Sequence, residues 1–182
     1  MSFKSTTYNK TDLISEFHFR TMDILVVTLF VVLTTLCTSA QPTQCPSGWK
    51  HRGNSCYAFF LDVPDGWTEA MLYCRALNAK LVEIETEMEN EFLRIYLMDH
   101  GYTKYFWIGL TDALVEGRWV WETTQTTPTY TNWGPGEPND SEHHEDCVHM
   151  YPSSFHWNDA PCNNKCSFIC EKDANEDIGI VG

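Results

Sequence analysis

Residues 105–121 read YFWIGLTDALVEGRWVW, and this stretch decides the fold class. It contains two short apolar runs, at 105–110 and 118–121, which are rich in aromatic and β-branched residues. Runs of this length and composition, bounded by polar and glycine residues, are typical of buried strands. The stretch therefore predicts two strands in the core of a domain, separated by a polar turn.

Two helices are expected before these strands. Residues of the first share an apolar face at helical spacing: Trp67, Ala70, Met71, Cys74 and Leu77. The second begins at the capping-box pattern Thr86-x-x-Glu89 and ends at Gly101. Its expected apolar face comprises Met88, Phe92, Ile95 and Tyr96.

Shorter strands and a long loop are expected in the rest of the chain. A hairpin is expected between Cys45 and Cys56, a strand near 81–84, and closing strands at 147–151 and 168–170. Residues 122–147 show little periodicity, and a loop of that length in a compact domain is either functional or a sign that the elements are wrongly assigned. The carboxylates at its end favour a functional loop. Trp133 is expected to pack beneath this loop. Helices early and strands late predict an α+β domain.

An N-terminal leader is expected before the domain. Residues 24–37 are apolar residues and threonines, followed by small residues at 38–40. This run is short for a membrane span, which needs about 20 residues, and its pattern indicates a signal peptide. We expect a signal peptide at 1–40, a domain at 41–173 and an acidic tail at 174–182. The protein would then be secreted and extracellular, with no membrane insertion in its mature form. Initiation at Met22 and a type II signal anchor are the alternatives.

Composition limits the partners. The formal net charge of −13 makes nucleic acid an improbable partner, because phosphate binding needs a basic face. An apolar fraction of 43% is enough to bury a core. The excess carboxylates indicate either a solvated acidic surface or sites for cations.

The expected export makes disulfides available to the cysteines. Of eight cysteines, seven remain once Cys37 leaves with the leader. Disulfides form readily in exported proteins, and an odd number leaves one thiol free or paired between chains. The sequence alone does not select among the possible pairings.

Six short motifs, in this order, resemble the C-type lectin domain. They are Trp107-Ile108-Gly109-Leu110, Glu116-Gly117-x-Trp119-x-Trp121, Glu137-Pro138-Asn139, Glu145-Asp146-Cys147, Trp157-Asn158-Asp159 and Phe168-Ile169-Cys170-Glu171. The resemblance covers residues 45–171. It implies an α+β C-type lectin-like fold with two helices, small antiparallel sheets and a long calcium-binding loop. It also implies the bridges Cys45–Cys56, Cys74–Cys170 and Cys147–Cys162. Cys166 has no place in that pattern, which leaves a free thiol or a covalent homo-oligomer open.

The resemblance also implies Ca²⁺ as the cofactor. Calcium takes about six to eight oxygen ligands, and residues 137–146 hold six carboxylate and amide side chains. The family pattern assigns a sugar-bearing calcium to Glu137, Asn139, Glu145, Asn158 and Asp159. It assigns an auxiliary calcium to Asp112, Glu116, Asp140 and Asp146. The peptide before Pro138 is expected to be cis, whereas Asp62 and Glu142 are expected to be solvated surface.

The implied function is recognition of a glycan, not catalysis. In this family Glu-Pro-Asn goes with equatorial 3- and 4-hydroxyls, as in mannose, glucose and N-acetylglucosamine, and with fucose. Such binding could serve innate immune recognition of glycans. The alternative is a C-type lectin-like domain that binds protein, ice or mineral.

Three local patterns near this loop have simpler explanations. The stretch from His144 to His149 lacks the His-Glu-x-x-His spacing of a zinc protease. His143 and His144 are expected to be exposed, although they could instead flank the sugar. Asn139-Asp140-Ser141 is a glycosylation sequon, and it is expected to be unoccupied because a glycan there would block the site.

Overall fold

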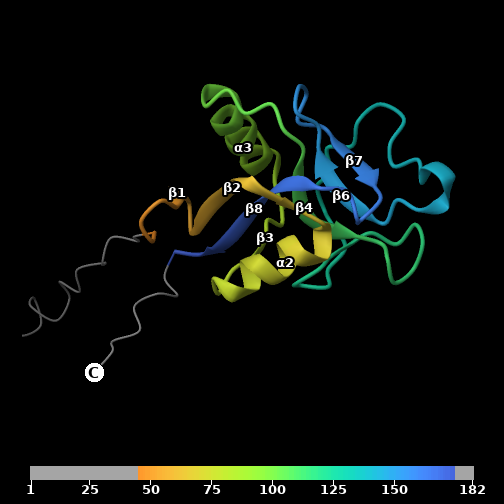
Figure 1. Ribbon diagram of the computed structural model, residues 1–182, viewed down its shortest axis with the longest axis horizontal. Coiled ribbons are helices and arrows are strands. Elements are labelled where there is room, and N and C mark those ends of the chain that lie inside the picture. Colours follow the sequence, from red (N-terminus) through yellow and green to blue (C-terminus); the bar gives the residue numbers. More distant parts are fainter. Residues whose placement is uncertain (1–44, 175–182) are drawn as a thin grey trace, which may run out of the picture. The chain divides into compact units, whose positions relative to one another are not determined.

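The computed structural model describes residues 45–174. The expected leader at 1–40 and the tail beyond Ala174 lie outside the described residues. Elements keep the labels of Figure 1. In chain order they are β1 (Lys50–Arg52), β2 (Ser55–Asp65), α2 (Trp67–Ala76), β3 (Lys80–Leu81), α3 (Glu87–Asp99), β4 (Phe106–Thr111), β5 (Val120–Trp121), the 3-10 turn η1 (Ser141–His143), β6 (Cys147–Met150), β7 (Trp157–Ala160) and β8 (Cys166–Asp173).

The strands of residues 45–174 form one connected sheet in the order β1-β2-β8-β4-β6-β7. In addition, β3 pairs with β8 and β5 pairs with β4. The β4–β8 pair is parallel, and the other pairs of named strands are antiparallel. The α+β class is therefore confirmed, and the expected small sheets are joined through the β4–β8 pair. Strand β7 was not predicted as a strand.

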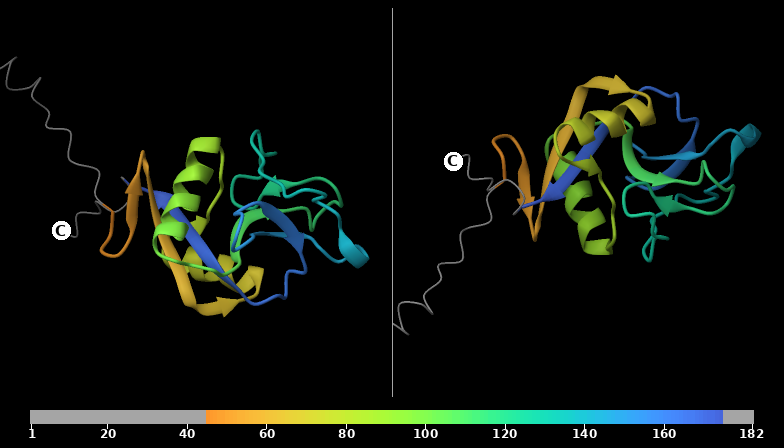
Figure 2. Two further views of the ribbon diagram at one scale, coloured as in Figure 1. Left: turned by 90° about the horizontal axis from the view of Figure 1, so that it is seen from above. Right: turned by 90° about the horizontal axis from the view of Figure 1, so that it is seen from below.

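The side chains of β4 alternate between two hydrophobic clusters. Phe106 and Ile108 belong to the cluster that includes Leu93 and Leu97 of α3. Trp107 belongs to the other cluster, which includes the buried residues of α2. Because successive strand residues point to opposite faces, the two helices cover opposite faces of the sheet, as Figures 1 and 2 show.

Gly109 in the centre of β4 is required by a close approach of the backbone. A Cβ atom there would lie 2.9 Å from the carbonyl oxygen of Leu81. The Gly109 N–H donates to the Val82 carbonyl at 2.8 Å, and its carbonyl accepts from Glu122 N–H at 2.8 Å. The glycine of the Trp-Ile-Gly-Leu motif therefore lets the segment after β3 lie directly against β4.

Helix α3 begins as predicted, but its buried face differs from the prediction. Thr86 caps the helix by accepting from Glu89 N–H at 3.2 Å. Leu93 and Leu97 are fully buried, whereas Met88 and Ile95 are 72% and 45% exposed.

Polar residues on the buried side of α3 explain why its buried face differs from the predicted one. The Glu89 carboxylate accepts from Tyr57 Oη at 2.6 Å, and Asn90 Oδ1 accepts from Trp157 Nε1 at 3.0 Å. The helix therefore turns two hydrogen-bonded polar side chains inward. The spacing of apolar residues in the sequence cannot predict a buried face that includes polar side chains.

The expected disulfides are confirmed. Within residues 45–174 the bridges are Cys45–Cys56, Cys74–Cys170 and Cys147–Cys162. Cys166 is free and buried, and burial raises its pKa to about 11. Because a second chain could not reach this thiol without local opening, the buried position argues against a covalent dimer through Cys166. None of the helices in the described part has the length and hydropathy to cross a bilayer.

Candidate metal and ligand site

A cluster of three carboxylates lies where β4 ends. Asp112 follows β4 directly, and its N–H donates to the carbonyl of Asp146 at 3.2 Å. Thr111 Oγ1 donates to the same carbonyl at 2.6 Å. These bonds join two segments distant in sequence, so that carboxylate oxygens of Asp112, Glu116 and Asp146 lie within 4.8 Å of one another.

Asp112 is buried without full compensation of its charge. Its Oδ2 accepts from Gly117 N–H at 2.8 Å, but its buried Oδ1 has no hydrogen-bond partner among the described residues. Burial, followed by the charges of Glu116 and Asp146, raises the pKa of Asp112 to about 6. A cation would offset this repulsion and give Oδ1 a partner. An all-oxygen donor set suits Ca²⁺, so these residues fit the expected ion.

A second group of polar side chains surrounds Asp159 of β7. The Asp159 side chain is fully buried and accepts from Asn139 N–H, at 3.1 Å to Oδ1 and 2.9 Å to Oδ2. It also accepts from Asp140 N–H at 2.6 Å. The Glu137–Pro138 peptide is cis, as expected, and Asn139 Nδ2 donates to Glu137 Oε2. The Glu137–Asp140 part of the long loop is therefore attached to β7 through the Asp159 carboxylate, and the Asn132–Gly134 part through backbone hydrogen bonds with Trp157.

Two residues that were not predicted as site residues hold Asn158. Tyr151 Oη donates to Asn158 Oδ1 at 2.8 Å. His149 lies opposite Asn158 in the β6–β7 pair, with Nε2 at 3.4 Å from Asn158 Nδ2. Burial lowers the pKa of His149 to about 4, so the ring is neutral at physiological pH. Alternation along a strand at 147–151 puts His149 and Tyr151 on one face, but only the pairing with β7 connects them to the site.

Glu137 and Glu145 lie in crowded negative surroundings. The pKa of Glu137 is raised, mainly by burial and next by the charge of Asp159. The pKa of Glu145 is raised by burial and by Asp159, although Glu145 Oε2 accepts from Ser141 N–H at 2.9 Å. Binding of a proton or of a cation would therefore stabilise both carboxylates relative to their ionised, unpaired forms.

Asp140 lies outside the three-carboxylate cluster to which it was assigned. Its Oδ2 lies 2.9 Å from His143 Nδ1, and this hydrogen bond lowers the pKa of Asp140. Its Oδ1 accepts from Glu145 N–H at 3.3 Å. The described residues thus bring together three of the four expected auxiliary ligands.

Residues expected to lie at the surface do so. Asp62, Glu142 and His144 are exposed, and the His143 side chain is 93% exposed. Trp133 packs edge-on against Trp119 and Trp157 beneath the loop, as expected.

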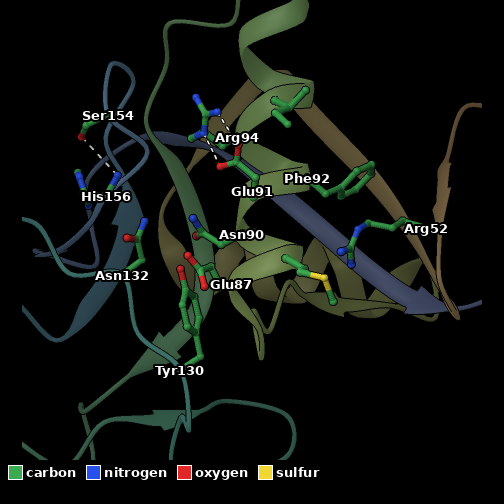
Figure 3. Close-up of a pocket in the computed structure, with 12 residues that line it drawn as sticks. Arg52, Glu87, Asn90, Glu91, Phe92, Arg94, Tyr130, Asn132, Ser154 and His156 are labelled. Atoms are coloured by element: carbon green, nitrogen blue, oxygen red, sulfur yellow. Dashed lines mark hydrogen bonds and ion pairs between the residues drawn. The ribbon is translucent and has the colours of Figure 1, made fainter.

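A groove of about 740 Å³ lies away from the candidate calcium ligands, between α3 and the segments around Tyr130 and His156. Figure 3 shows Tyr130 close to Glu87, and Arg94 paired with Glu91. Both Arg94–Glu91 contacts are 2.6 Å. Arg52 lies over the ring of Phe92. None of the expected calcium ligands lines this groove, so it is separate from the candidate site.

Comparison with known proteins identifies the family. The family model described as "Lectin C-type domain" matches residues 63–172. Perlucin of Haliotis laevigata is 37% identical over 131 residues, which are 71% of this chain and 83% of that protein. The human scavenger receptor C-type lectin carbohydrate-recognition domain superposes with a TM-score of 0.66 at 34% identity, covering 71% of this chain and 99% of that chain.

A calcium-independent type II antifreeze protein has a similar structure, with a TM-score of 0.64 at 27% identity, covering 71% of this chain and 95% of that chain. The family model spans well over half of the chain, and the motifs, disulfides and fold agree with it. The chain belongs to the C-type lectin domain family.

Proposed function

We propose that this chain is a secreted, calcium-dependent lectin that recognises sugars with vicinal equatorial hydroxyls, such as mannose, glucose and N-acetylglucosamine, and also fucose. The observation that carries the proposal is the fastening of the Glu137–Asn139 segment to the buried carboxylate of Asp159. With this contact in place, residues far apart in the sequence would supply one set of oxygen donors to the ion. These donors are Glu137, Asn139, Glu145, Asn158 and Asp159.

In the proposed mechanism the side chains recognise hydroxyl groups and no bond is broken. The bound ion would supply coordination of two sugar oxygens. The carboxylates of Glu137 and Glu145 would accept the hydroxyl protons, and the amides of Asn139 and Asn158 would donate to the same oxygens. Alternation of acid and amide selects the geometry of the hydroxyl pair. One such site is weak, on the order of millimolar or about −4 kcal/mol, so avidity would need linked sites.

We propose that Asp112, Glu116 and Asp146 hold an auxiliary Ca²⁺, with Asp140 as a further ligand. The unpartnered Oδ1 of Asp112 supports this assignment. Asp140 would have to exchange its contact with His143 for the ion. Chelation should therefore release the ion and loosen residues 137–146, because Pro138 is the only apolar residue of this segment.

We propose that residues 1–40 are removed on export and that the domain extends over 41–173. Disulfides of this number are maintained in oxidising compartments, which supports a secreted protein. The net charge of −13 argues against nucleic acid as a partner.

Retention on immobilised mannose tests the proposal. The protein should bind in calcium and elute with a chelator, and a glycan array with and without chelator should identify the preferred sugars. The matched variant is Glu137→Gln with Asn139→Asp, which exchanges acid and amide. It should shift preference toward galactose while its fold and calcium-induced stabilisation persist. Unchanged specificity would refute the assigned roles of these two residues.

Binding of ice, mineral or protein without sugar is the second candidate. Its support is the similarity to a calcium-independent antifreeze protein. This candidate would be favoured if retention on glycans persisted in chelator. It would also be favoured if the protein were not retained but showed thermal hysteresis or adsorbed to mineral.

A further inference from the structure

We propose that two copies of this chain associate through the outer face of α3, in an antiparallel arrangement about a twofold axis. Four apolar side chains of α3 lie outside its buried face, and we call them the α3 stripe: Met88, Phe92, Ile95 and Met98. Met88, Ile95 and Met98 are 72%, 45% and 53% exposed. Residues three or four positions apart are neighbours on a helix surface, so the stripe is continuous. A continuous apolar surface of this kind is typical of an interaction site.

The α3 stripe lies along the floor of the 740 Å³ groove. Met88, Phe92 and Ile95 line this groove. Figure 3 shows α3 between Arg52 on one side and His156 on the other. Helix α3 has 13 residues, which corresponds to a length of about 20 Å. A groove with a helix as its floor and polar residues along its sides can accept a second helix laid along it.

The charges around the α3 stripe favour a second copy of the chain as the partner. Two arginines and two glutamates line the groove, so it has no net charge. They are Arg52, Arg94, Glu87 and Glu91. Elsewhere the net charge of −13 makes two copies repel each other. A basic partner would be attracted to the acidic segment at 137–146 instead, whereas a copy of this chain can approach through the neutral groove.

A twofold axis between Glu91 and Arg94 makes this face complementary to itself. Under such an axis each contact occurs twice, with the roles of the two copies exchanged. Antiparallel α3 helices then place Glu91 of one copy opposite Arg94 of the other, and Met88 opposite Met98. Within one chain Glu91 and Arg94 already pair at 2.6 Å, with side chains 48% and 33% exposed. An exposed pair of this kind contributes little, so exchanging partners costs little.

The dimer is weak and leaves the candidate sugar sites accessible. One helix face per copy buries an area at the low end of specific interfaces, below about 1,200 Å². We expect a Kd on the order of 10–100 µM. None of the expected calcium ligands lines the groove. The association therefore goes beyond the proposed function and does not depend on it, although two linked sites would bind a glycan-coated surface more tightly than one.

Sedimentation velocity from about 1 µM to 1 mM tests the proposal across the expected Kd. The full chain is produced in a secreting host and measured in chelator, which excludes association through calcium-bound glycans. The wild type should shift from monomer to dimer. Met88→Glu places a charge in the centre of the interface and should weaken the dimer about tenfold or more. The matched control Leu72→Glu changes an apolar residue that is 54% exposed on α2, and it should leave the Kd within about twofold.

Exchange of the two charges tests the twofold arrangement itself. Glu91→Arg and Arg94→Glu should each weaken self-association about fivefold or more, because like charges then face each other. An equimolar mixture of the two variants should form a dimer within about twofold of the wild-type affinity, since each variant supplies the charge that the other lacks. Thermal unfolding monitored by circular dichroism should show all variants folded.

Three outcomes would overturn the proposal. The first is a wild type that remains monomeric up to about 1 mM. The second is a Met88→Glu variant that dimerises as the wild type does, and the third is a mixture of charge variants that associates no better than either alone. Retention on mannose in calcium is scored separately. Its absence in a protein that still dimerises would refute the proposed function and leave this inference standing.

Discussion

Substitution of Asp112 by asparagine should stabilise the calcium-free protein. The side chain of Asp112 is 2% exposed, and one oxygen has no partner among the described residues. In the Asp112→Asn variant the amide oxygen could still accept from Gly117 N–H, while the amide nitrogen would meet the carboxylates of Glu116 and Asp146. The substitution therefore replaces repulsion by attraction with little change in shape.

The size of the effect follows from the pKa of Asp112. A rise from 3.8 to about 6 corresponds to an upper limit of about 3 kcal/mol at neutral pH. Glu116 is exposed, and solvent near it screens part of this energy. We expect a gain of roughly 1–2 kcal/mol, which is several degrees in Tm for a domain of this size.

The sign of the pH dependence gives an internal check. The pKa of Asp112 is raised on folding, so the folded state binds the proton more tightly than the unfolded state. The destabilisation of the folded state by ionised Asp112 therefore reaches its full value above about pH 6 and disappears below about pH 4. The stability difference between variant and wild type should follow the same course and vanish in acid.

Urea unfolding with a chelator present, with disulfides intact, measures the difference. The matched control is Asp62→Asn, which changes an exposed carboxylate whose nearest cation, Lys104, is 3.8 Å away. In calcium the order should reverse, because the variant loses a ligand of the ion. The reasoning would be refuted if the variant were no more stable than wild type in chelator. It would also be refuted if calcium stabilised the variant against urea as much as it stabilises the wild type.

Three further predictions concern the loop, the helix and the free thiol. Because the pKa values of Glu137 and Glu145 are raised, protons should displace calcium at higher pH than from ordinary carboxylates; equilibrium dialysis between about pH 7 and pH 4 should show progressive loss, and undiminished binding at pH 4 would contradict it. Leu93→Ala should cost about 2–5 kcal/mol in thermal or urea unfolding, whereas Ile95→Ala on the exposed face should cost about 1 kcal/mol or less; similar losses would mean that the helix face is misassigned. Cys166 should resist alkylation until the protein unfolds, and non-reducing electrophoresis should show no dimer through it; rapid labelling in native buffer would place the thiol at the surface.

Motifs with a local physical cause could be predicted from the sequence. Thr86 and Gly101 mark the ends of a helix through capping chemistry, and both expectations hold. The glycine in residues 107–110 is part of the recognised pattern, but its reason is the approach of Leu81, which lies far away in the sequence. The pattern identifies the fold, and the packing explains the pattern.

Long-range pairing could not be derived from the sequence. The inner face of α3 is defined by hydrogen bonds from Tyr57 and Trp157 to polar side chains, which a hydrophobic periodicity misses. In the same way, His149 acquires a role only because β7 lies beside β6. The family pattern assigns Asp140 to an ion, and the sequence does not show that its side chain contacts His143.

The pairing of β2 with β8 brings the entry and exit of the domain together. Ser55 lies opposite Asp173, and the Ala174 N–H donates to the Asn54 carbonyl at 2.8 Å. The candidate ligands Asn158 and Asp159 lie on β7, at the other edge of the sheet. Figure 1 shows the same separation between β1 and the loop before β6. Tethering through either end of residues 45–174 should therefore leave the binding loop facing outward, which is the geometry that a surface coated with such domains needs in order to engage many glycans at once.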